Sequence, residues 1–280
     1  QGGWIHTKYG EDWFIHFQDK GPYGRVCHLQ PVDWSSGWPV MGNAGEPYWK
    51  FRKPKSDSKT IVNPVETDEF DSSKLGMQWQ WQNDYKESYG QATSMGFFRL
   101  FTYALPELGD VSNLWYVPNM LLQKTPADEF TATTKLSFCS RNSDQYVGLV
   151  CMSAEYSSVG LQRTEDGYEL QIRHNPNAMR THLTDEVLTV DTLKPTQKGT
   201  PRKGRPAEMH IKDVYLRMSI KDSKVNYAYS IDGKKWKKAG GEYAMGKGRW
   251  IGSKIGFFAV DPNKTGRKGF IDIDWFRISR

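Results

Sequence analysis

Two tryptophans on one predicted strand are the residues best suited to ligand binding in this sequence. Trp79 and Trp81 alternate with Gln78, Gln80 and Gln82, so a strand would place both indoles on one face and the amides on the other. Rings at this spacing can stack on sugar rings while the amides bond hydroxyl groups. Burial of both rings in a hydrophobic core is the alternative, which the size of an indole favours.

Two further tryptophans lie outside such an alternation. Trp115 belongs to a less regular segment, and we expect it at the rim of a loop. Trp250 stands between Gly248 and Gly252 at the start of a predicted strand, where an aromatic side chain can project from its domain. Both positions therefore remain candidates for contact with a ligand.

No complete catalytic motif accompanies these rings. The sequence lacks a nucleophile elbow, a P-loop and a dinucleotide-binding fingerprint. A triplet of alternating carboxylates, as in several sandwich-fold glucanases, is approached at Glu66 to Phe70, but its third position is Phe70. Glycoside hydrolysis needs only two carboxylates. Glu11, Asp12 and Asp19 are predicted to lie in turns, and we expect turn acids to be solvated rather than catalytic.

The histidines and cysteines give no clear metal or redox signature. None of the six histidines shows H-x-x-x-H spacing. Cys27, Cys139 and Cys151 are an odd number without a C-x-x-C pair, which disfavours a zinc site and a disulfide framework. We expect buried free thiols, with a Cys139–Cys151 disulfide as the less favoured alternative.

Composition excludes several classes of protein. The 280 residues are 38% hydrophobic and 14% aromatic, which excludes intrinsic disorder. No apolar run approaches the roughly 20 residues of a membrane span, so we expect no membrane partner. No leader peptide is visible, which is uninformative for a chain that starts within a longer protein. The net charge of +6 comes largely from two basic clusters, residues 194–205 and 234–238. We interpret both as solvated loops and expect no nucleic-acid partner.

The first 45 residues predict a four-stranded antiparallel meander with strands near residues 4–7, 13–18, 25–30 and 38–41. Apolar residues occur on both faces of this sheet. A small sheet with two apolar faces is typical of one β-propeller blade, which requires stacked neighbours to bury those faces.

Residues 46–66 are rich in proline and charge and predict a linker, and residues 67–280 predict a two-sheet β-sandwich. No sustained helical period occurs, so the fold class is all-β. Asp232-Gly233 predicts a two-residue hairpin turn. The strands expected in the sandwich cover residues 77–82, 97–101, 119–124, 131–139, 146–152, 160–163, 168–173, 214–220, 225–231, 250–260 and 270–278.

The combination of motifs resembles glycoside hydrolase family 43. The segments similar to the last propeller blade of that family are Gln1 to Trp4, Asp12 to Asp19, Tyr23 to Pro31 and Trp38 to Gly42. The segments similar to its C-terminal sandwich, which has a concanavalin-like jelly-roll fold, are Asp68 to Phe70, Gln78 to Trp81 and Asp272 to Arg277. That sandwich occurs in the β-xylosidase and α-L-arabinofuranosidase branch.

The resemblance implies a five-bladed propeller enzyme that hydrolyses xylosides or arabinofuranosides with inversion. Its catalytic carboxylates would lie upstream of Gln1, so we expect no catalytic residue in this chain. Arg25 matches the arginine that contacts substrate in the family, and Trp250 falls where the sandwich of some members walls the pocket. The expected partners are xylo- or arabino-oligosaccharides and the missing blades. A periplasmic or extracellular location is favoured, and a non-catalytic carbohydrate-binding sandwich is the alternative.

Calcium is the one cofactor that we consider. The family often holds calcium on the propeller axis through a histidine that would lie upstream of this chain. A separate calcium ion could bind where Asp68 or Glu69 meets Asp272 or Asp274, because calcium takes several oxygen ligands from such meeting points. The favoured alternative is a set of acids at an exposed sheet edge.

Overall fold

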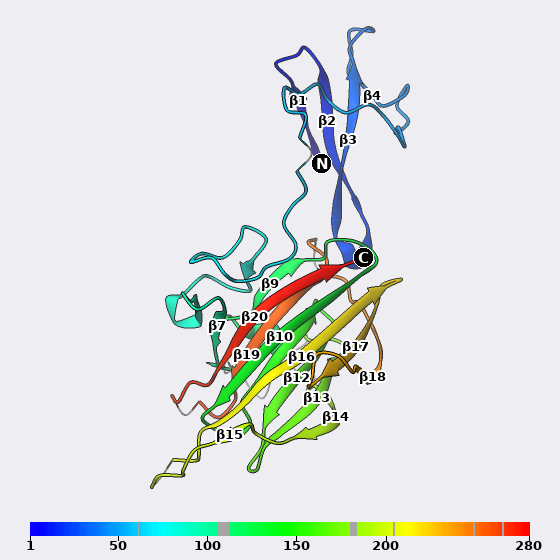
Figure 1. Cartoon of the computed structure of the whole chain (residues 1–280). Coiled ribbons are helices and arrows are strands. Elements are labelled where there is room, and N and C mark those ends of the chain that lie inside the picture. The colour runs from blue at the N-terminus through cyan, green and yellow to red at the C-terminus, as the bar shows by residue number, and fades with distance from the viewer. Residues whose placement is uncertain (61, 106–112, 180–183, 204, 249, 265) are drawn as a thin grey trace.

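The computed structural model describes residues 1–280 except 61, 106–112, 180–183, 204, 249 and 265. Within these residues the chain is all-β, as expected, and its only helical elements are three 3-10 turns, η1 (Gly21–Tyr23), η2 (Glu87–Tyr89) and η3 (Leu114–Tyr116). No helix in the described part is long and apolar enough to cross a membrane. Figure 1 shows a narrow sheet standing on one end of a two-sheet sandwich.

The narrow sheet is an antiparallel meander of β1 (Gly2–His6), β2 (Asp12–Asp19), β3 (Arg25–Asp33) and β4 (Val40–Met41). All four strands lie at the predicted places, and β2 and β3 are longer than expected. The register pairs His16 with His28, so alternate residues of β2 and β3 share a face. We refer to this sheet as the blade.

Both faces of the blade carry exposed apolar side chains. The most exposed is Trp38, at 75%, and the others are Trp4, Ile5, Ile15, Val26, Leu29, Trp34 and Met41. Soluble monomers rarely leave contiguous apolar surface of this kind uncovered. The blade thus has the surface of a sheet that packs between neighbours.

The first part of the linker folds back on the blade. The Gln30 side chain bonds both backbone groups of Tyr48, at 2.8 and 3.3 Å, and the ring of Phe51 lies 5.8 Å from that of Trp13. Glu11 accepts the Lys55 N–H at 2.8 Å and pairs with an arginine, and only 8% of its surface is exposed. The expectation that Glu11 is a solvated turn acid was therefore wrong, because the linker covers it.

The sandwich is formed by two eight-stranded sheets. The first has the order β18-β17-β16-β10-β20-β7-β6, with β15 beside β16, and the second has the order β14-β13-β12-β11-β19-β9-β5, with β8 beside β19. The first sheet contains β6 (Gly90–Ala92), β7 (Phe98–Phe101), β10 (Phe130–Ser140), β15 (Gln197–Lys198), β16 (Met209–Lys221), β17 (Lys224–Ser230), β18 (Lys237–Ala244) and β20 (Phe270–Ser279). The second contains β5 (Gln80–Trp81), β8 (Tyr103–Ala104), β9 (Leu121–Lys124), β11 (Tyr146–Met152), β12 (Tyr156–Arg163), β13 (Tyr168–Asn175), β14 (Glu186–Leu193) and β19 (Lys254–Asp261).

The main core lies between the two sheets and includes alternate residues of β10, such as Leu136 and Phe138. Strands β11 and β19 are buried on both faces, because a second cluster around Leu114 and Tyr146 covers the outer side of their sheet. Double burial explains why these two strands read as continuous apolar runs.

The sandwich differs from the prediction in two respects. Five strands were missed: β6, β8 and β15 are only two or three residues long, and β14 and β18 are largely exposed edge strands without clear alternation. The hairpin at Asp232-Gly233 is not a two-residue turn, since its loop spans residues 231–236. Asp232 organises this longer loop by accepting the N–H groups of Lys234 and Lys235, and these bonds lower the pKa of its carboxyl to about 2.

The three cysteines are free thiols in different environments. Cys27 is exposed, whereas Cys139 and Cys151 are buried, and burial raises the pKa of each buried thiol to about 12. The less favoured Cys139–Cys151 disulfide is not formed. Because attack on a disulfide reagent requires an accessible thiolate, we expect the two buried thiols to react slowly with such a reagent.

We expect an aromatic disulfide reagent at pH 8 to modify one of the three thiols in the native protein and all three after denaturation. Cys27→Ser removes the fast-reacting thiol, and absorbance of the released product counts the groups. Rapid modification of two or more thiols in the folded protein would contradict the burial of Cys139 and Cys151.

Candidate functional site

The blade and the sandwich bring Arg25 and Trp250 together. Arg25 begins β3, and its backbone N–H donates to the Trp250 carbonyl at 3.1 Å. Its guanidinium carbon lies 5.8 Å from the centre of the Trp250 ring and 4.4 Å from that of Phe17. Nη1 also donates to the Gln1 side chain at 3.1 Å. Two residues distant in sequence thus form one cationic and aromatic surface, the Arg25–Trp250 pair.

A tight backbone contact holds this pair in place. The Ser253 N–H donates to the Pro22 carbonyl at 2.6 Å, and a Cβ on Gly252 would lie 2.5 Å from the Gly24 nitrogen. Gly252 also has a φ of +73°, which favours glycine. Figure 1 shows this contact where the β2–β3 turn meets the sandwich beside the C-terminus.

Tyr23 anchors the same turn through its hydroxyl group. That group donates to the Asp128 carbonyl at 3.1 Å and accepts the Ser223 N–H at 3.2 Å. One side chain therefore links the blade to two loops of the sandwich. These bonds fix the blade where Arg25 can reach Trp250.

The Arg25–Trp250 pair is suited to a polyhydroxylated ring. Trp250 is 64% exposed, so its indole is free to pack against the apolar face of a sugar. The planar guanidinium of Arg25 carries several donors in a fixed fork that matches adjacent hydroxyls or a carboxylate. The pair can bind and orient a ligand, and it provides no proton donor or acceptor for hydrolysis at neutral pH.

The structure does not place Trp79 on a binding surface. Trp79 is 9% exposed, packs against Phe70, Phe257 and Phe276, and donates its indole N–H to Asp68 at 2.7 Å. The sugar-stacking role considered for Trp79 was therefore wrong, and the core position that the size of an indole favours is observed. The hydrogen bond to Asp68 satisfies the indole N–H, and the ring packs in the core of the sandwich.

Trp81 is half-buried and packs against Tyr85, Tyr89 and Phe98. It shares the inward direction of Trp79, as the alternation predicted, but its surroundings are aromatic side chains of the same domain. The tryptophan-rich strand thus contributes mainly to packing.

The acids proposed for calcium do not converge. Asp274 forms an ion pair with Lys135 at 2.8 Å, and Asp272 binds Arg99 through both oxygens at 2.7 and 2.8 Å. Glu69 binds an arginine of β20 in the same bidentate way, and Asp68 accepts the indole N–H of Trp79. Each carboxylate therefore already faces its own donor, and none of these four belongs to a cluster of metal-binding side chains in the described residues.

A small cavity beside the Trp250 loop was missed by the sequence analysis. It has a volume of about 260 Å³ and is lined by Gln82, Trp115 and Lys254 together with Gly252. Lys254 is 9% exposed, and burial lowers the pKa of its ammonium group. Nζ donates to the Gln82 side chain at 3.0 Å. No sequence signal marked this lysine, because its burial depends on strands far apart in the chain.

A family model described as the beta xylosidase C-terminal concanavalin A-like domain, GH43_C2, matches residues 67–279. The chain belongs to this family. The GH43_C2 match begins near the end of the linker and includes Trp250 and both sheets of the sandwich. It therefore accounts for the sandwich, whereas the blade lies outside the matched residues.

Longer proteins resemble this chain over both the blade and the sandwich. It is 27% identical to a beta-xylosidase of Formosa agariphila, in an alignment that covers 99% of this chain and 47% of the relative. A putative beta-xylosidase of Xylanibacter ruminicola is 29% identical over 91% of this chain and 43% of the relative. The GH43 BlXynB protein of Bacillus licheniformis has the same fold, with a TM-score of 0.76, 24% identity and coverage of 99% of this chain and 52% of that one. The chain spans about half the length of these relatives.

The core position of Trp79 predicts a large effect on stability. We expect Trp79→Ala to lower the free energy of unfolding by about 3–5 kcal/mol, because it removes a buried indole and leaves a cavity. Trp38→Ala, at an exposed position, is the matched control and should change stability by no more than about 0.5 kcal/mol. Urea unfolding followed by circular dichroism compares the two, and equal small effects would contradict the core position.

A methyl group added at Gly252 would clash with the backbone of Gly24. Gly252→Ala should loosen the contact between blade and sandwich and lower the unfolding temperature. Gly10→Ala tests the conformational cost alone, because Gly10 has a similar φ of +71° with open space around it. Each substitution costs about 1–2 kcal/mol from the positive φ, and only Gly252→Ala adds a clash. Equal losses in thermal unfolding would show that the contact is not restrictive.

Proposed function

We propose that this chain is the C-terminal part of a glycoside hydrolase that removes xylose or arabinofuranose from plant cell-wall polysaccharide. Its family membership supports a role in a glycoside hydrolase, and the names of the similar proteins support a xylose-releasing activity. The observation that carries the proposal is the meeting of Arg25 with the exposed Trp250 where the blade joins the sandwich.

In the proposed mechanism this chain binds and orients the substrate. Arg25 donates hydrogen bonds to neighbouring hydroxyls, and Trp250 packs against the sugar and limits access of water from the sandwich side. The proton donor and the base that activates water would come from blades upstream of Gln1. Inverting hydrolysis places these two carboxyl groups about 6.5–9.5 Å apart, on opposite sides of the bond that breaks.

The exposed faces of the blade support the same proposal. A propeller blade buries such faces against the blades on either side. Exposed side chains such as Trp4 and Ile15 would then be covered by further blades, and the junction at Gly252 would hold the sandwich against the edge of the propeller.

A non-catalytic carbohydrate-binding sandwich is the less favoured alternative. The burial of Trp79 and the packing of Trp81 remove the platform on which that alternative mainly depended. The cavity between Trp115 and Lys254 still offers an aromatic wall next to a polar group, but it is too small for more than about one sugar ring.

We expect Arg25→Gln to lower kcat/KM about 10- to 100-fold in a protein that extends this chain by the upstream blades. The loss corresponds to the ~1.5–3 kcal/mol of a hydrogen bond from a charged donor. Release of nitrophenol from 4-nitrophenyl β-D-xylopyranoside and α-L-arabinofuranoside gives the rates. Arg202→Gln, in the loop between β15 and β16 at the far end of the sandwich, is the control (Figure 1).

Calorimetric titration of the chain by itself with xylohexaose tests where the catalytic groups lie. Because we place the carboxylates upstream, we expect no sustained heat of hydrolysis. Sustained heat would contradict the proposal, as would full activity of the extended protein after Arg25→Gln. Saturable heat that is lost in Trp115→Ala but retained in Trp250→Ala would favour the carbohydrate-binding alternative.

A further inference from the structure

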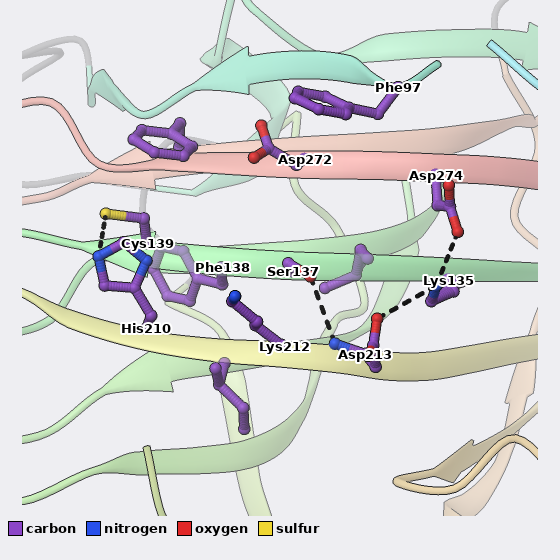
Figure 2. A pocket seen from close by; sticks show the side chains of 13 residues that line it. Phe97, Lys135, Ser137, Phe138, Cys139, His210, Lys212, Asp213, Asp272 and Asp274 are labelled. Carbon is purple, nitrogen blue, oxygen red and sulfur yellow. Dashed lines mark hydrogen bonds and ion pairs between the residues drawn. The ribbon is translucent and has the colours of Figure 1, made fainter. Parts of the chain in front are cut away.

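A groove on the outer face of the first sandwich sheet ends at a group of metal-binding side chains. The groove has a volume of about 290 Å³ and runs along β10, β16 and β20. Cys139 and His210 lie at one end of it, as Figure 2 shows, and Lys135 and Asp274 lie at the other. Neither the proposed substrate site nor the blade contributes to this groove.

The strand register brings the group together. Cys139 of β10 lies directly opposite His210 of β16 in the antiparallel pair. Glu208 precedes His210 by two residues, which places both side chains on the same side of the chain. Cys139 Sγ is 3.5 Å from His210 Nε2, which is 2.9 Å from Glu208 Oε1, and all three atoms lie within 4.8 Å of one another.

These separations are close to those of a tetrahedral zinc site. Zinc–sulfur bonds of about 2.3 Å and zinc–nitrogen or zinc–oxygen bonds of about 2.0 Å give ligand separations of about 3.5 Å for S···N and about 3.3 Å for N···O. The observed 3.5 and 2.9 Å differ from these by a few tenths of an ångström at most. Small side-chain rotations would therefore admit the ion without a change in the backbone.

A neighbouring arginine orients the Glu208 carboxylate for metal binding. Arg141 Nε donates to Glu208 Oε2 at 2.7 Å, which leaves Oε1 directed at His210. Metal-binding carboxylates are commonly oriented by such an outer hydrogen bond. His210 is partly exposed to the groove, whereas Cys139 is buried, so an ion would enter from the groove and reach the sulfur last.

We propose that Cys139, His210 and Glu208 bind one zinc ion, with the fourth ligand position open to the groove. One sulfur, one imidazole nitrogen and one carboxylate oxygen suit a borderline divalent transition metal, whereas calcium and magnesium prefer oxygen ligands alone. The thiol proton passes to solvent as the zinc–sulfur bond forms. The ion would link β10 to β16, and the proposal is independent of the proposed hydrolase function.

Titration of the chelator-treated chain with Zn²⁺ in a calorimeter tests the site, and Co²⁺ reports on its ligands. We expect one ion per chain and, with Co²⁺, the near-ultraviolet charge-transfer absorption of a thiolate ligand. Cys139→Ser should abolish that absorption and weaken zinc binding at least about 100-fold, the upper range for loss of an outer partner. Cys27→Ser, which removes the exposed thiol, is the matched control and should leave both signals unchanged.

Glu208→Gln and His210→Gln provide a second test in case the buried cysteine cannot be replaced without unfolding. Both side chains are partly exposed, and circular dichroism checks that each variant is folded. Each should weaken zinc binding at least about tenfold. Unchanged affinity in these variants, or a cobalt complex without thiolate absorption, would overturn the proposal and assign any binding to other histidines, such as the paired His16 and His28 of the blade.

Discussion

The contact between two glycine backbones, Gly24 in the blade and Gly252 in the sandwich, is the constraint on which the candidate site depends. At this distance neither residue has room for a side chain, so the two domains meet through main-chain atoms. The hydrogen bonds of Pro22 and Tyr23 surround that contact and fix its direction. Arg25 follows immediately in the chain, and its position relative to Trp250 is therefore set by backbone geometry rather than by flexible side chains.

The sequence predicted those elements whose pattern depends on local chemistry. Strands with alternating or continuous apolar residues, such as β10, β11 and β19, were found near their observed positions because burial determines the residue types in them. The edge strand β14 is largely exposed and carries no such pattern. The loop at Asp232 shows a related limit, because side-chain capping of two N–H groups stabilises a longer turn than the Asp-Gly dipeptide alone indicates.

The candidate site was less accessible from sequence. Arg25 and Trp250 were identified through a family resemblance, and their meeting depends on a contact that spans most of the chain. A buried Trp79 and an exposed Trp79 would both produce the same alternation of tryptophan and glutamine in the sequence. Only the packing of the two sheets against each other shows that the ring is buried. Likewise, the sequence left a calcium site open as the less favoured reading of the acids in the first and last segments of the sandwich domain, and the structure places Arg99, Lys135 and other cations beside them instead.

The packing of the linker on the blade has a consequence for the way such domains can be exchanged between proteins. Contacts from Tyr48, Phe51 and Lys55 to the blade mean that a recombination breakpoint at residue 46 would strip the cover from Trp13 and Glu11. A breakpoint beyond Asp57, whose carboxylate still binds the β1–β2 turn, keeps this cover intact. A blade that is transferred to another protein by recombination therefore needs the first part of the linker, up to about residue 57, to keep its own packing.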